Sequence, residues 1–345
     1  MSTERFDPSQ DGDAFRAPIA PVASGIVRPL WSVMIPSYHC ANHLAFTLES
    51  VLRQDLGPDV MQIEVVDDHS TQDDPEAVVR EIGGDRVAFY RQPENRGHTG
   101  NFETCLARAR GHLVHQLHGD DGVRDGFYRT MQQRFEEHPE IGAAFARTIM
   151  IRDDGIWESL SPIEAARSGV LPDLLQRLAH RNRIMTPAMV VRREVYEKLS
   201  GFDRRLSWTE DWEMWARIAA QFPVWYENEP LGLYRLNDGS NTARYALTAE
   251  NIRDWRRAAE LISEYLPAAE REASVRECLN NAASYAVKTA GQLLERGEFD
   301  GAFAQLREAR VCRGGSLRGG IARGYERAFR AKLSQGRTER TWNRG

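Results

Sequence analysis

Short apolar runs alternate with helix-like stretches through the first third of the chain. The apolar runs are expected to form buried strands over residues 31–36, 63–66, 87–90 and 112–117. Between these runs, hydrophobic residues recur every three or four positions, which is typical of a helix with one buried face. Strands that alternate with helices predict a parallel sheet with right-handed crossovers and helices on both faces. The pattern therefore predicts an α/β fold.

Two of the predicted helices carry polar residues that suit their N-termini. Asn42 is expected to cap the helix that follows the first strand, because its short side chain can accept a backbone N–H bond. Asp74 and Pro75 mark the start of the second helix, which is expected to end near Ile82. Later in the chain, Thr209 is expected to cap a helix that carries acidic residues in its first turn.

The remainder of the chain continues the α/β pattern and then becomes helical. We expect a helix over residues 125–137, and strands over 141–151 and 185–191. From Leu247 onward, hydrophobic residues recur at helical spacing, so a helical extension is expected there.

Two of the predicted strands end in adjacent aspartates, Asp67–Asp68 and Asp120–Asp121. The carboxyl ends of parallel strands meet at one edge of a sheet, where ligands of open α/β folds bind. Carboxylate oxygens at that edge can hold a hard divalent cation. An aspartate pair is also common in an ordinary polar turn after a strand. Because two pairs are expected at one edge, turn chemistry alone is a poor explanation.

Composition and cysteine usage indicate the class of protein and its compartment. The chain has 345 residues, enough for about two domains of the usual size. No apolar run approaches the roughly 20 residues that span a bilayer, and residues 1–24 lack the apolar core of a signal peptide. The four cysteines lie far apart, which argues against a zinc site or a disulfide framework. These features predict a cytoplasmic location.

The charge of the chain is unevenly distributed. Residues 301–345 contain eleven Lys or Arg and three Asp or Glu, a local net charge of +8, so the other residues carry −13 of the total −5. A basic tail on an acidic body suggests an anionic partner for the tail, such as the inner face of a membrane. A solvated basic end fits this charge equally well, and no nucleic-acid partner is expected.

Six short motifs occur in an order that resembles the family-2 glycosyltransferases of GT-A fold, over about residues 30–242. In chain order they are Pro36-Ser37-Tyr38, Val65-Val66-Asp67-Asp68-His69-Ser70-Thr71, Asn95-Arg96-Gly97, Leu117-His118-Gly119-Asp120-Asp121, Gly201-Phe202-Asp203 and Thr209-Glu210-Asp211. Each motif is weak alone, whereas six in this order are specific. The resemblance implies a Rossmann-like, mostly parallel sheet flanked by helices, here with a C-terminal α-helical extension.

The resemblance also implies a reaction and the residues that perform it. Such enzymes move a sugar from a nucleotide-diphosphate donor to an acceptor hydroxyl with inversion, here a saccharide or glycolipid in surface polysaccharide or glycolipid synthesis. Asp211 corresponds to the general base, and Asp120 to the residue that binds Mg²⁺ or Mn²⁺. The residues implied in binding the nucleotide sugar are Pro36, Ser37, Tyr38, Asp67, Asp68, Arg96, His118, Asp121 and Glu210.

Two positions depart from the family pattern and leave alternatives open. His118 stands where the D-x-D motif usually begins with aspartate, and Asn237 stands where many members carry histidine. A catalytically inactive nucleotide-sugar-binding module of the same fold is therefore an alternative. A sugar-phosphate nucleotidyltransferase is another, but the glycine-rich, basic loop usual after its first strand is missing from residues 37–41.

These observations predict four segments. Residues 1–28 are expected to form a flexible arm, and residues 29–245 the glycosyltransferase domain. Residues 246–312 are expected to form the helical extension. Residues 313–345 are the basic tail, with a weak amphipathic pattern at Ile321, Tyr325, Phe329 and Leu333.

Overall fold

A computed structural model describes residues 14–237, 241–315 and 319–330. The chain divides into two compact units. The first comprises Met1–Leu178, Asn182–Arg205 and Glu210–Leu236, and the second comprises Ala179–Arg181, Leu206–Thr209 and Asn237–Gly345.

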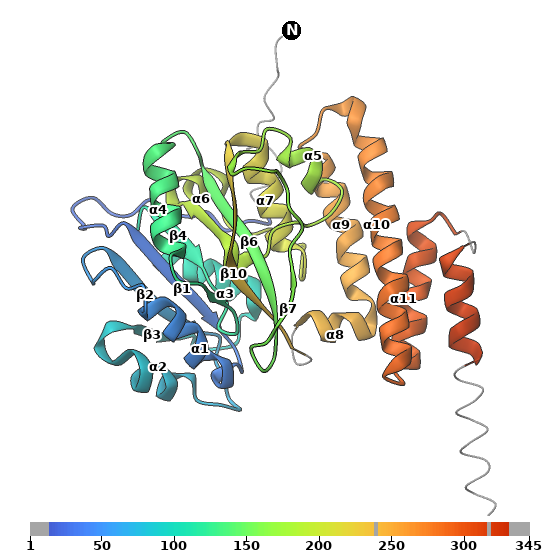
Figure 1. Cartoon of the computed structure of the whole chain (residues 1–345), viewed down its shortest axis with the longest axis horizontal. Helices are drawn as coiled ribbons and strands as arrows, with labels where there is room; N and C mark the ends of the chain where they lie inside the picture. Colours follow the sequence, from blue (N-terminus) through green and yellow to red (C-terminus); the bar gives the residue numbers. More distant parts are fainter. Residues whose placement is uncertain (1–13, 238–240, 316–318, 331–345) are drawn as a thin grey trace, which may run out of the picture. The chain divides into compact units, whose positions relative to one another are not determined.

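The described part of the first unit is built on one ten-stranded mixed sheet (Figure 1). Its main path has the order β3-β2-β1-β4-β9-β6-β10-β5, while β7 pairs with β6 and β8 with β10. The strands are β1 (Trp31–Ser37), β2 (Met61–Asp67), β3 (Ala88–Arg91), β4 (Leu113–Gln116), β5 (Gly122–Val123), β6 (Ala143–Arg152), β7 (Trp157–Leu160), β8 (Gly169–Val170), β9 (Met189–Arg192) and β10 (Val224–Leu236).

The predicted parallel half of the sheet is confirmed. Strand β1 pairs in parallel with both β2 and β4, and β2 pairs in parallel with β3. All residues of β1, β2 and β4 are buried, as expected for strands covered on both faces. In the register of β1 and β2, Ser37 lies opposite Asp67. The first aspartate pair therefore lies beside the end of β1, at the sheet edge where β4 also ends.

The other half of the sheet includes antiparallel pairs. Strand β9 runs antiparallel to both neighbours, β4 and β6, whereas β10 runs parallel to β6. Strand β9 lies between β4 and β6. The 3₁₀ turn that precedes it, η2 (Thr186–Ala188), therefore lies beside β4.

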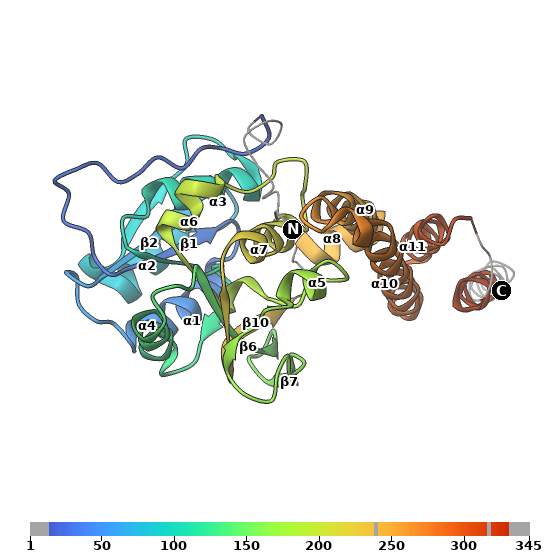
Figure 2. The same ribbon diagram turned by 90° about the horizontal axis from the view of Figure 1, so that it is seen from above.

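Helices cover both faces of this sheet. Figure 2 shows α3 and α6 on one face and α1 and α4 on the opposite face. The helices and the further 3₁₀ turn of this unit are α1 (Ala41–Leu52), α2 (Pro75–Gly83), η1 (Gly84–Arg86), α3 (Gly97–Arg108), α4 (Phe127–Glu137), α5 (Leu174–Leu178), α6 (Arg193–Leu199) and α7 (Glu210–Gln221). A hydrophobic core of side chains from β1, β2, β4, α1 and α4 holds these layers together.

One predicted helix cap is confirmed and another is wrong. The Asp74 side chain accepts a hydrogen bond from the Ala77 N–H at the start of α2, with Oδ1 3.1 Å from the nitrogen. Helix α1, in contrast, begins at Ala41, so Asn42 lies inside it. The Ala41 N–H donates to Asp73 Oδ2 at 2.8 Å. A side chain from a different loop therefore does the work expected of Asn42.

The segment expected to be a flexible arm is anchored over its described part. Arg16 is buried and pairs with Asp203 at 3.1 Å and with Glu213 at 3.0 Å. Arg16 also forms an isolated β-bridge with Asp203, and Ile19 is buried. A buried guanidinium needs its ionic partners to remain in place, so these contacts anchor the chain at residues 16–19. The expectation of a flexible arm for the rest of residues 1–28 stays a prediction.

The second unit is helical, as expected for the C-terminal extension. Figure 1 shows α10 running alongside α9 and α11. Its helices are α8 (Asn241–Thr248), α9 (Glu250–Ser263), α10 (Ala268–Glu295) and α11 (Phe299–Cys312), followed by a helix over 320–330. The unit begins at Asn237, several residues before the expected boundary. Within the described residues, no helix is long and apolar enough to span a membrane.

The expected amphipathic pattern after residue 313 is partly visible. Ile321 is buried, and the Tyr325 ring packs against Phe303 with ring centroids 6.2 Å apart. Phe329 is 59% exposed, although its ring edge meets Phe303. Leu333 lies outside the described residues.

Candidate functional site

The loop after β4 brings together three side chains that can bind a cation. His118, Asp120 and Asp121 each offer one ligand atom, and these atoms lie within 4.8 Å of one another. Asp121 is buried, and its Oδ1 accepts the backbone N–H of Arg235 at 2.8 Å. Burial, together with the charge of Asp120, raises the pKa of Asp121 to about 6.

Arg235 of β10 fixes the shape of this loop. Its Nε donates to the Asp120 carbonyl at 2.8 Å, and its Nη1 donates to the Asp153 carbonyl at 2.8 Å. The guanidinium also lies over the Phe46 ring, 4.7 Å from the centroid. One arginine thus holds the backbone of two loops, and the Asp120 and Asp121 side chains are held with that backbone.

Two buried polar atoms in the cluster lack a hydrogen-bond partner among the described residues. They are Asp121 Oδ2 and His118 Nε2. His118 Nδ1 lies 3.5 Å from Asp121 Oδ2, which is too long for a good hydrogen bond. A buried polar atom without a partner is costly, and both atoms belong to ligand types that divalent cations use. The side chains present therefore fit a divalent cation.

Asp211 lies in the first turn of α7 and has the properties of a proton acceptor. Its Oδ2 accepts the hydroxyl of Thr186 at 3.0 Å, and its Oδ1 accepts the N–H of Trp212 at 2.6 Å. Burial raises the pKa of Asp211 to about 7, and the charge of Glu210 acts in the same direction. A carboxyl group with a pKa near neutral pH is suited to general base catalysis.

The neighbouring Glu210 is instead held in an ion pair. Its Oε1 lies 3.0 Å from His98 Nε2, and its other oxygen, Oε2, is buried without a partner among the described residues. Burial alone would raise the pKa of Glu210, but the charge and hydrogen bond of His98 lower it. For His98, burial works against the charged form, but Glu210 raises the pKa overall.

His118 links the loop after β4 to the start of α7. Burial lowers the pKa of His118, but the charges of Asp121, Asp120 and Asp211 together raise it above its ordinary value. Its ring stacks on Phe102, with centroids 5.1 Å apart, and Phe102 also meets the His98 ring edge-on at 5.5 Å. The candidate metal ligands and the candidate base therefore form one electrostatic cluster.

The other aspartate pair is bound by its own loop. Asp67 is fully buried; its Oδ1 accepts the hydroxyl of Ser70 at 2.5 Å, and its Oδ2 accepts the Ser70 N–H at 3.0 Å and Arg91 Nε at 2.9 Å. Asp68 Oδ1 accepts the Arg96 N–H at 2.7 Å. Burial raises the pKa of Asp68. A direct contact of this pair with a nucleotide stays a prediction.

The remaining candidate donor-binding residues differ in exposure. Pro36 and Ser37 are the buried end of β1, and Ser37 Oγ lies 3.4 Å from Cys40 Sγ. Tyr38 is 46% exposed, with its ring centroid 4.0 Å from that of His39. Arg96 is exposed and donates to Thr104 at 3.3 Å. Tyr38 and Arg96 thus present side chains that a ligand can reach, and their roles stay predictions.

Two residues of the site were missed at the level of sequence. His98 follows the Asn95-Arg96-Gly97 motif and pairs with Glu210, while Thr186 bonds to Asp211. Thr186 lies in the stretch 185–191 that is expected to form a strand, and threonine is a common residue in strands, so the sequence gives no sign of a functional role. For His98 the one available signal was its place directly after a motif.

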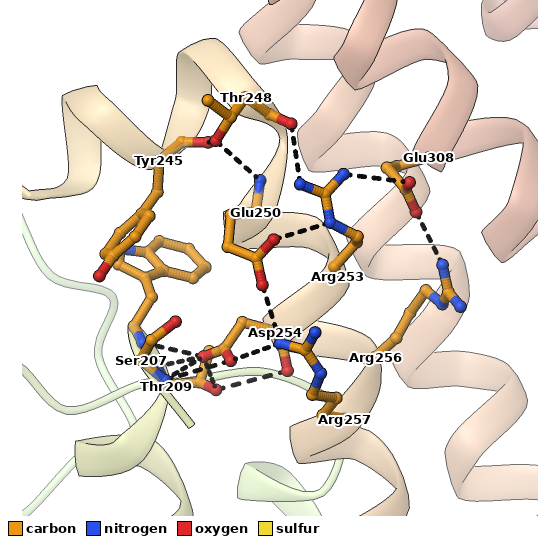
Figure 3. Close-up of polar contacts among 11 residues, drawn as sticks. Ser207, Thr209, Tyr245, Thr248, Glu250, Arg253, Asp254, Arg256, Arg257 and Glu308 are labelled. Atoms are coloured by element: carbon orange, nitrogen blue, oxygen red, sulfur yellow. Dashed lines mark hydrogen bonds and ion pairs between the residues drawn. The ribbon is translucent and has the colours of Figure 1, made fainter. Parts of the chain in front are cut away.

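The segment that leads into α7 is fixed by Asp254, which like that segment belongs to the second unit. Figure 3 shows the Asp254 carboxylate facing Ser207 and Thr209. Asp254 Oδ2 accepts the N–H groups of Trp208 and Thr209, both at 2.9 Å, and the Thr209 hydroxyl at 2.8 Å. Asp254 is fully buried. Residues 207–209 directly precede Glu210, so this carboxylate orders the chain at the start of the acidic motif.

Residues 32–200 match the family described as glycosyl transferase family 2. The match contains both aspartate pairs, whereas Glu210 and Asp211 follow it. TarS 1-349 from S. aureus, solved in complex with UDP-GlcNAc, has a TM-score of 0.61 at 16% identity, covering 84% of this chain and 93% of that chain. At this identity the similarity shows the fold, and the expected GT-A fold is confirmed.

Similar sequences extend the match. The uncharacterized protein MT1568 of Mycobacterium tuberculosis is 31% identical over 243 residues, which cover 67% of this chain and 74% of that protein. The chondroitin synthase of Pasteurella multocida is 22% identical over 194 residues, which cover 55% of this chain and 19% of the synthase. This chain thus aligns with about a fifth of that synthase. With the ordered motifs, the fold and these matches, the chain belongs to the family-2 glycosyltransferases.

Proposed function

We propose that this protein is an inverting glycosyltransferase that moves a sugar from a nucleotide-diphosphate donor to an acceptor hydroxyl. The observation that carries the proposal is that the contacts from His118 to Phe102, from Phe102 to His98 and from His98 to Glu210 join the cluster of His118, Asp120 and Asp121 to the start of α7, where the pKa of Asp211 is raised to about 7. Proton acceptance and diphosphate binding are the two tasks of this reaction, and each part of the cluster is suited to one of them.

Asp211 takes the proton of the acceptor hydroxyl. The acceptor oxygen forms a bond to the anomeric carbon, the bond from that carbon to the diphosphate oxygen breaks, and the nucleoside diphosphate leaves. Thr186 donates to Oδ2 at 3.0 Å and so orients the carboxylate. A positioned base typically contributes about 10²–10⁴ in rate. Inversion in one displacement needs no protein nucleophile.

Asp120 and Asp121 would hold a Mg²⁺ or Mn²⁺ ion, with His118 beside them. When bound, such an ion neutralises the negative charge that develops on the leaving diphosphate. The support is that two buried ligand atoms, Asp121 Oδ2 and His118 Nε2, have no hydrogen-bond partner among the described residues.

The donor nucleotide would lie along the edge formed by the ends of β1 and β2. Tyr38 and Arg96 are exposed there, and Asp67 and Asp68 shape the loop that a base and ribose would meet. Ligands bind beyond the carboxyl ends of parallel strands in open α/β sheets. Glu210 would contact the sugar through Oε2.

The acceptor is proposed to be a saccharide or a glycolipid, in surface polysaccharide or glycolipid synthesis at the cytoplasmic face of a membrane. The similarity to a chondroitin synthase supports a saccharide acceptor.

The net charge of +8 over residues 301–345 supports peripheral contact with anionic lipid. Full-length protein should therefore sediment with vesicles that contain phosphatidylserine, and should dissociate at high salt; equal binding to neutral vesicles would contradict this contact.

The test of activity is incubation with a panel of nucleotide sugars, Mn²⁺ and candidate saccharide acceptors. Transfer, or slow hydrolysis of one donor, is expected, with the product in inverted configuration. Donor binding with neither reaction across the panel would instead support a non-catalytic binding module. A product of retained configuration would contradict inversion while leaving transfer intact.

A further inference from the structure

The pair of His98 and Glu210 stands directly beside the proposed base. His98 lies in the first turn of α3, and Glu210 is the first residue of α7. Their atoms Nε2 and Oε1 are 3.0 Å apart; Glu210 is buried, while the His98 side chain is 24% exposed. Loss of the His98 charge is unfavourable, because the charge of the buried Glu210 would remain uncompensated.

The charges that act most strongly on the Glu210–Asp211 pair come from two histidines. His98 comes from α3 and His118 from the loop after β4; Thr186, from the turn before β9, contributes a neutral hydroxyl. His98 is the group that touches Glu210, whereas His118 acts on both acids over a longer distance. Two adjacent carboxyl groups repel each other when both are ionised, so a cation bound to one decides which of them retains a proton more easily.

We propose that His98 is a positioning residue that holds Glu210 ionised and in one orientation, and thereby makes Asp211 the proton acceptor of the pair. This inference rests on the proposed function. It assigns a task to a residue that no motif singles out, and it explains why two neighbouring acids in the first turn of one helix have different roles.

The same ion pair leaves one carboxylate oxygen for substrate. His98 takes Oε1, while Oε2 is buried without a partner among the described residues. An ionised carboxylate with one free oxygen is a strong hydrogen-bond acceptor for a sugar hydroxyl. Orientation of Glu210 by His98 therefore also fixes where that hydroxyl is accepted.

A double-mutant cycle tests whether His98 acts through Glu210. His98→Gln should lower kcat by about 10- to 100-fold, because the reacting groups lose their alignment. In the Glu210→Gln background the same change should have little further effect, because the partner charge is already removed. Equal losses in both backgrounds would overturn the proposal. His138→Gln is the matched control, since it breaks a histidine–glutamate pair of 3.3 Å with Glu140 at an exposed position.

The pH profile separates this role from a merely structural one. Without the positive charge of His98, Glu210 should hold a proton more readily and Asp211 should ionise at lower pH. The acid limb of the pH profile of kcat should therefore move to lower pH in His98→Gln. His98→Lys, which keeps a positive charge, should leave the limb near its original position. No shift or an upward shift in His98→Gln would show that Glu210 stays ionised without His98, and would overturn the proposal.

A measurement that does not depend on turnover distinguishes failure of the proposed glycosyltransferase function from failure of the role proposed for His98. The His98 imidazole can be titrated by NMR in the full-length protein, and its pKa should fall in Glu210→Gln but not in Glu140→Gln. If no donor is turned over but this coupling is seen, the proposed function fails and the ion pair stands. If transfer is seen but His98 titrates alike in both proteins, the inference fails and the proposed function stands.

Discussion

Two acidic pairs follow parallel strands of one sheet, yet their surroundings differ. After β2, both oxygens of Asp67 are taken by Ser70 and Arg91 of its own surroundings. After β4, Asp121 Oδ1 accepts a backbone N–H, while the buried Oδ2 has no hydrogen-bond partner among the described residues and lies 3.5 Å from His118 Nδ1. The difference shows that an aspartate pair in a sequence can either stabilise a loop or remain available to bind a ligand. The hydrogen-bond partners of the carboxylates distinguish the two cases.

The contrast extends to the acids of α7. Glu210 keeps Oε2 without a hydrogen-bond partner among the described residues, whereas Asp254 of the second unit accepts N–H and hydroxyl groups, as Asp67 does from Ser70 and Arg91. Burial of a carboxylate is therefore a poor guide to function by itself. The count of hydrogen bonds that the chain itself supplies is the better guide.

The largest effect is expected for Asp211→Asn, which removes the proton acceptor but keeps the shape of the side chain. Transfer should fall by about 10²–10⁴, because a positioned base contributes that much. Donor affinity should remain close to that of the unmodified protein, as measured by calorimetry with the nucleoside diphosphate. Asp125→Asn, at an exposed position, is the control for the chemical change. Full turnover in Asp211→Asn would remove this residue from the reaction.

A smaller effect is expected for Asp120→Ala, on binding and not on folding. Affinity for the nucleoside diphosphate in the presence of Mn²⁺ should fall about 10- to 100-fold, as loss of an oxygen ligand weakens cation binding. Affinity without metal should be little changed. If the metal dependence of binding persists in this variant, the cation is held elsewhere.

Asp67→Asn should act on stability. Loss of the charge weakens the bonds to Arg91 and Ser70, so the free energy of unfolding should fall by about 1–3 kcal/mol in denaturant titration. Asp120→Ala should show no comparable loss, since Asp120 is proposed to serve a ligand. An unchanged unfolding midpoint in Asp67→Asn, with donor binding lost, would reverse the contrast between the two pairs.

The last effect concerns the pH dependence of stability. The pKa of Asp211 is raised from 3.8 to about 7 in the folded protein, so ionisation costs stability as pH rises through this window. Asp211→Asn should therefore melt at higher temperature than the unmodified protein at pH 8, by about 2–4 °C for each kcal/mol recovered. The difference should shrink as pH falls toward 4. A difference that does not vary with pH would contradict the raised pKa.

Much of the parallel half of the fold followed from the sequence, because strands β1 to β4 are local apolar runs with helices between them. The placement of β9 did not follow, since nothing in residues 189–192 states that they run antiparallel between β4 and β6. The cap of α1 was missed for the same reason, because Asp73 reaches Ala41 from a separate loop.

The site shows the same division between local and distant information. The acids at 67, 68, 120, 121, 210 and 211 are visible as motifs, and the charges of Asp120, Asp121 and Asp211 all raise the pKa of His118. Their partners are not visible, because Arg235 is 114 residues from Asp121 and Thr186 is 25 residues from Asp211. Residue types in sequence thus indicate candidate chemistry, while hydrogen-bond partners, which depend on the fold, distinguish the roles.

The bonds of Asp254 constrain how proteins of this kind can be redesigned. The three residues before the acidic motif of α7 have their N–H groups satisfied by a carboxylate that comes from the helical extension. A chimera built to alter acceptor choice could replace this extension with that of a relative. The exchange would remove the Asp254 carboxylate unless the relative has an equivalent acidic residue. Successful chimeras should therefore retain an acidic residue at position 254, whatever else is exchanged.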